Sequence, residues 1–106
     1  MGKFLFKVNY TTLGLQGLMK EGGNARKAVA EEAAGSVGGT VESFHFALGD
    51  TDAFIIAEMP DVVAAASVAL KVSASGAVSV KTVALLDPDE VDAATGVEVS
   101  YRPPGE

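Results

Sequence analysis

The chain of 106 residues contains no cysteine and no tryptophan, and it has a single histidine. Without cysteine it can form no disulfide, no thiolate nucleophile and no cysteine-ligated metal site. That composition is compatible with a cytoplasmic protein, which is the location we expect. Basic residues are also few, since eight lysines and arginines against fourteen acids leave a net charge of −6. Such a surface repels a phosphate backbone, so we expect no nucleic-acid partner.

Long apolar runs are missing as well. The longest weakly polar stretch, residues 62–70, is too short to span a bilayer. Residues 1–7 lack the apolar region of a secretory signal, so we expect no membrane partner. The length fits one domain. We predict a domain over residues 1–96 and a tail over 97–106, with a short strand pattern at its start and a frayed end.

Apolar periodicity predicts an α+β fold. Strand patterns cover residues 3–10, 40–48, 53–59 and 77–86, with a loop of roughly four residues between the second and third strands. Helical patterns cover 25–37 and 62–74, with Asn24 and Asp61 as the expected N-caps, and short helices follow Thr11 or Thr12 and Pro88. This order predicts a ferredoxin-like β-α-β-β-α-β layout, with a four-stranded antiparallel sheet and two helices on one face.

The other face of that sheet also carries apolar side chains. The third strand is apolar on both faces, and the first strand adds Leu5 to its more polar side. A bare apolar sheet face is unusual in a monomer. We therefore expect this face to pack against a second copy of the chain, in a homodimer or a higher oligomer. The alternative is that the C-terminal segment folds over the sheet.

Several blocks of the sequence occur in the same order as similar blocks of a known protein family. They are Gly17–Arg26, Phe46–Ala53, Met59–Asp61, Ser73–Val78 and Leu86–Glu90. Over about residues 3–94 the chain resembles the GYD domain family. The resemblance implies a ferredoxin-like monomer that pairs into a dimeric α+β barrel, an architecture shared with small monooxygenases, muconolactone isomerase-like proteins and stress-responsive barrel proteins. Thr51 departs from the family, because a tyrosine is expected there.

Four polar residues on strands are candidates for a ligand site. His45 shares a face with Val41, Ser43 and Ala47 by strand parity, and it is either a general base or metal ligand, or a half-buried structural residue. The others are Lys7, Asn9 and Lys81. If they face the barrel interior, they line a pocket for an anionic or carbonyl ligand. If they face water, they keep the strands soluble.

The acidic clusters have simpler explanations. Asp50 and Asp52 flank Thr51, where they either bind a cation or act as acid and base, or else bond nearby backbone amides of the turn. The acids at 87–92 suit the start of a helix and lack the other ligands of a calcium loop. We expect no cofactor and no metal.

Two functions remain open. The first is a homodimeric α+β barrel domain that binds a small molecule between its sheets. The second is a cofactor-independent monooxygenase or isomerase that acts on an aromatic or lactone substrate, with His45 as the catalytic base. A nucleotide-sensing module fits less well, because no basic loop of useful length is present to bind phosphate.

Overall fold

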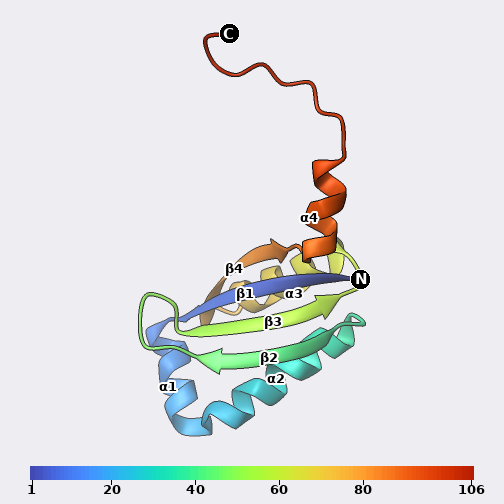
Figure 1. The fold of residues 1–106 in the computed structure, drawn as a ribbon. Coiled ribbons are helices and arrows are strands. Elements are labelled where there is room, and N and C mark those ends of the chain that lie inside the picture. Colours follow the sequence, from blue (N-terminus) through green and yellow to red (C-terminus); the bar gives the residue numbers. More distant parts are fainter.

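The computed structural model describes all of residues 1–106 and contains one four-stranded antiparallel sheet with four helices. The sheet order is β2-β3-β1-β4, so β1 lies between β3 and β4 (Figure 1). This order confirms the ferredoxin-like α+β prediction. In chain order the elements are β1 (Gly2–Tyr10), α1 (Thr12–Glu21), α2 (Gly23–Ser36), β2 (Thr40–Phe46), β3 (Ala53–Met59), α3 (Val62–Ala74), β4 (Val78–Leu85) and α4 (Pro88–Thr95).

The main core lies between the sheet and helices α2 and α3. Its buried members come from β1, β3 and these two helices. On β1, Phe4, Phe6 and Val8 are buried, while the residues between them are half-buried. Helix α2 lies against β2 and α3 against β4 (Figure 1). The two helices therefore cover one face of the sheet, as the alternation along β1 predicts.

The helix starts depend on local capping. Thr11 Oγ1 accepts a hydrogen bond from Gly14 N at the start of α1, and Asp61 Oδ1 accepts one from Ala64 N at the start of α3. The prediction of Asn24 as the cap of α2 is wrong, because the helix already begins at Gly23. Gly22 has a φ of 89°, which lets α2 follow α1 after a single residue.

Strand β2 differs from the prediction in two ways. It ends at Phe46, so six residues, 47–52, join it to β3, and Ala47 N donates to Asp52 O across this loop. A β-bulge also interrupts its pairing between Val41 and Ser43. The extra residue reverses the parity, so Val41 packs against the core while Ser43 and His45 are on the opposite face. The prediction that all three share a face was therefore wrong for Val41.

The C-terminal segment leaves the body of the domain. Helix α4 contributes no buried residue, and residues 97–106 form no helix or strand. Both extend away from the sheet, and the molecule is 57 Å long against 33 and 23 Å in the other directions (Figure 1). The C-terminal segment therefore does not fold over the sheet of its own chain. None of the helices has the length and apolar character needed to cross a membrane.

Two glycines of α1 provide a test of this packing. A Cβ on Gly14 would lie 1.9 Å from the carbonyl oxygen of Ala77, which also accepts hydrogen bonds from Thr11 N and Oγ1. We expect Gly14→Ala to lower the free energy of unfolding by about 1–3 kcal/mol, as overpacking does. A Cβ on Gly17 meets nothing within 4 Å. Gly17→Ala should therefore raise the free energy of unfolding by about 0.5–1 kcal/mol. Urea unfolding of both variants measures the two changes. Equal effects of the two substitutions would contradict this packing.

Candidate functional site

The face of the sheet that α2 and α3 leave uncovered is the candidate site. The register aligns its side chains in rows that run across all four strands. From β2 to β4, one row contains Ser43, Ile56, Leu5 and Val83, and the next contains His45, Phe54, Lys7 and Lys81. An apolar row therefore lies beside a row that contains three of the four predicted ligand residues. We call this surface the open face.

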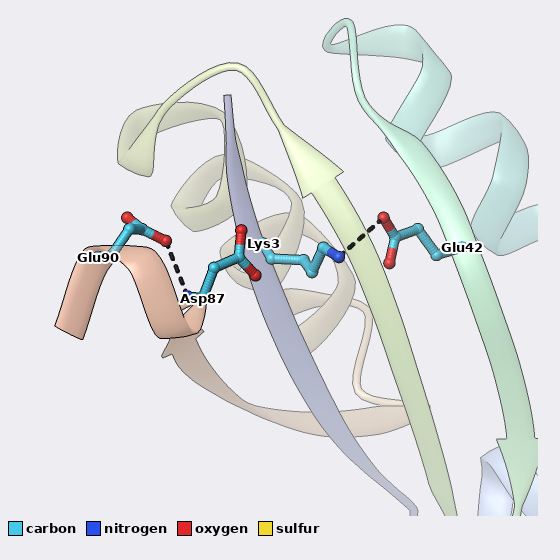
Figure 2. A network of polar contacts seen from close by, with 4 residues as sticks. All are labelled: Lys3, Glu42, Asp87 and Glu90. Carbon is cyan, nitrogen blue, oxygen red and sulfur yellow. Dashed lines mark hydrogen bonds and ion pairs between the residues drawn. The ribbon is translucent and has the colours of Figure 1, made fainter. Parts of the chain in front are cut away.

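Lys7 and Lys81 are direct partners across β1 and β4. Side chains in that relation have Cβ atoms about 4.5–5.5 Å apart, and like charges there repel each other. Neither lysine forms an ion pair. Lys3, at the other end of β1, does form one, since its Nζ lies 3.4 Å from Glu42 Oε1 (Figure 2). The unneutralised positive charge of the open face is thus concentrated at Lys7 and Lys81.

His45 lies at the β2 edge of the same row. It is exposed, makes no side-chain hydrogen bond, and is paired with Phe54 of β3. Neighbouring strands are about 4.8 Å apart, so His45 and Lys7 are separated by about 10 Å across Phe54. One small molecule lying on the Phe54 ring can therefore contact the imidazole and a lysine together.

Asn9 is held by a different interaction. Its Oδ1 accepts a hydrogen bond from Asp52 N at 3.0 Å, and Asp52 Oδ2 in turn accepts one from Tyr10 N at 2.9 Å. These bonds attach the β2–β3 loop to the end of β1. The oxygen of Asn9 and one oxygen of Asp52 are thus engaged within the protein. The Asp52 carboxylate bonds an amide of β1, whereas the turn interpretation expected an amide of its own turn.

No metal-binding arrangement exists near this loop. Asp50 is exposed and makes no hydrogen bond, and no three histidine or carboxylate side chains gather closely enough to hold a metal ion. Thr51, at the position where a tyrosine is expected, is half-buried between the two aspartates. The loop therefore supplies structural hydrogen bonds and no evident ligand set.

A second feature lies on the helix side of the sheet and was missed in the sequence. It is a cavity of about 80 Å³ lined by eighteen residues, of which seventeen are hydrophobic. Its walls come from α2, α3 and all four strands. The signal that could have revealed it is the small size of the side chains that α2 and α3 direct toward the sheet.

Comparison with known proteins gives a match to a protein family. The family model described as GYD domain matches residues 4–95, which extend from the first strand to the last helix. No curated protein and no solved structure matches the chain.

The hydrogen bonds around Asp52 generate a prediction for the loop. Asp52→Ala leaves Tyr10 N without its acceptor, so the free energy of unfolding should fall by about 1–3 kcal/mol. Asp52→Asn keeps an acceptor oxygen and should restore most of the loss. Asp50→Ala is the matched control and should change stability by less than about 0.5 kcal/mol. Thermal unfolding of the three variants checks the order; equal losses for both alanine variants would contradict it.

Proposed function

The chain belongs to the GYD domain family, and we propose that it is a homodimer of the α+β barrel type that binds a small molecule between its two sheets. The observation that carries the proposal is the open face itself. It combines an apolar row with an adjacent pair of unneutralised lysines, and both α4 and the C-terminal tail extend away from the sheet (Figure 1).

The apolar row supports the dimer. Leu5, Ile56 and Val83 are neighbours across three strands, and 41% of the Val83 surface is exposed. Exposed apolar surface of this kind marks a contact with another molecule. A two-fold axis parallel to the sheet brings the open face of a second copy against this one, so one patch serves both partners.

The lysine pair supports an anionic ligand. In such a dimer the second copy adds its own Lys7 and Lys81 to the space between the sheets. Positive charges enclosed without a counter-charge are costly, because desolvation removes their hydration and nothing offsets it. A small anion with an apolar body supplies the counter-charge and also packs on Phe54. Its negative group would bind the lysines, and its apolar part would contact the neighbouring row.

A second function, catalysis, is favoured by the position of His45. Its imidazole has no hydrogen-bond partner and lies in the same row as Lys7 and Lys81. A base there can take a proton from a substrate whose developing negative charge is stabilised by the lysines. This would be a cofactor-independent monooxygenase or isomerase acting on an aromatic or lactone substrate. His45→Ala should then abolish turnover, and unchanged turnover would remove His45 from the reaction.

The dimer is tested by adding a charge to the open face. Val83→Glu puts one carboxylate from each copy into the apolar interface, where burying its charge is costly, so the dimer should dissociate at least about a hundredfold more readily. Val63→Glu is the control, because Val63 lies on α3 and is already 76% exposed. Sedimentation velocity at micromolar concentration measures both. A monomeric unmodified protein, or a Val63→Glu variant that dissociates while Val83→Glu does not, would contradict the proposed interface.

The ligand site is tested with benzoate as the probe. Benzoate should shift the amide resonances of Lys7, Phe54 and Lys81, and Lys81→Gln should weaken its binding about tenfold through loss of a charge-assisted contact. Lys20→Gln, an exposed substitution on α1, should leave the affinity unchanged. Absence of shifts on the open face, or shifts confined to α2 and α3, would count against a site between the sheets.

A further inference from the structure

The helix-side cavity arises from the sequence of the two helices that cover it. The lining residues of α2 are mostly small, with Val29, Ala30 and Ala33 among them, and α3 contributes Val68, Ala69 and Val72. None of them is a leucine, isoleucine or phenylalanine. Side chains this short leave space above the sheet that a close-packed interior would fill.

The interior of this cavity suits an apolar molecule. Seventeen of its eighteen lining residues are hydrophobic, and the chain has no buried polar or charged residue. A water molecule needs two to four polar partners, which the alanine and valine walls do not offer, and apolar walls of this type accept apolar guests. The space is about 80 Å³, and Val29, one of its lining residues, is 44% exposed. A guest can therefore be small or can extend toward solvent at that wall.

Arg26 provides the only charged group in the wall. It lies in the first turn of α2, and its guanidinium is held only by a contact of 3.9 Å between Nη1 and Glu21 Oε2. A ligand carboxylate can replace this weak contact with two parallel charge-assisted hydrogen bonds. The charge at the wall is therefore complementary to an acid.

Aromatic contacts place Tyr10 at the end of the cavity that is formed by the start of α2, where Arg26 lies. Tyr10 also lines the cavity, and its ring stacks on Phe46 with centroids 6.4 Å apart. The Phe46 ring in turn lies against Gly23, the first residue of α2. The Tyr10 hydroxyl makes no hydrogen bond within the protein. Arg26 and Tyr10 thus provide polar groups around the start of α2.

We propose that the cavity between α2, α3 and the sheet is a binding site for a small apolar monocarboxylate, with the carboxylate on Arg26 and the apolar body among the alanines and valines. This site lies on the opposite side of the sheet from Lys7 and Lys81, so it does not depend on the function proposed for the open face. Binding is non-covalent and requires no other reactant.

Hexanoate and hexan-1-ol are the probes, because they share an apolar chain and differ in charge. In NMR titrations of the full chain, both should shift the methyl resonances of Val68 and Val72. Arg26→Gln should weaken hexanoate binding at least about tenfold and leave hexan-1-ol binding unchanged. This variant alters a partly exposed side chain, so it keeps the proposal testable if a core variant fails to fold.

A pair of substitutions on α2 tests the location. Ala30→Leu fills the cavity and should abolish binding of both probes, whereas Ala28→Leu, on the exposed side of the same helix, should bind both as the unmodified protein does. The proposal is overturned if hexanoate fails to bind at millimolar concentration, or if Ala30→Leu folds and binds normally. Equal loss of both probes in Arg26→Gln would also overturn it. Hexanoate shifts confined to Lys7 and Lys81 would reject this cavity and support the open-face site.

Discussion

The alternation of side chains along β1 is the constraint on which the rest of the structure depends. This strand pairs with both β3 and β4, so its two faces set the character of the whole sheet. Phe4, Phe6 and Val8 face the helices and are buried, whereas Leu5 and Lys7 face the other way. Because side chains on a strand point alternately to opposite faces, one strand supplies both the core and the open face.

The two sides of the sheet differ in what the chain leaves unfilled or uncovered. On the helix side, the short side chains of α2 and α3 cover the sheet without filling the space above it, and a cavity of about 80 Å³ results. On the open side, no element of the chain covers the apolar row or the lysine pair. The space on the helix side can hold a small guest. The open face presents an uncovered apolar row and two positive charges, which a second copy of the chain and an anion would cover and neutralise.

Much of the fold could be predicted because its signals are local. Thr11 and Asp61 are short polar residues before apolar helices; Asp61 caps as predicted, and Thr11 is the one of the two candidates, Thr11 and Thr12, that caps α1. Asn24 failed as a cap because Gly22, with its positive φ, let α2 start at Gly23, two residues before the predicted start. Strand β2 carries no local mark of its bulge, so parity placed Val41 on the wrong face. A bulge depends on the partner strand, which a single strand's sequence does not describe.

The sequence by itself determined the order of the elements and the apolar character of both sheet faces, because each depends on residues near one another in the chain. It also determined the family, through short blocks that occur in a fixed order. Only the tertiary structure decided which candidate residues meet. The strand register pairs Lys7 with Lys81 and places His45 in the same row. Asn9 instead accepts a hydrogen bond from Asp52 N in the β2–β3 loop. These relations join strands separated by up to about seventy residues, and they are set by hydrogen-bond register between strands, which residue spacing along the chain does not encode.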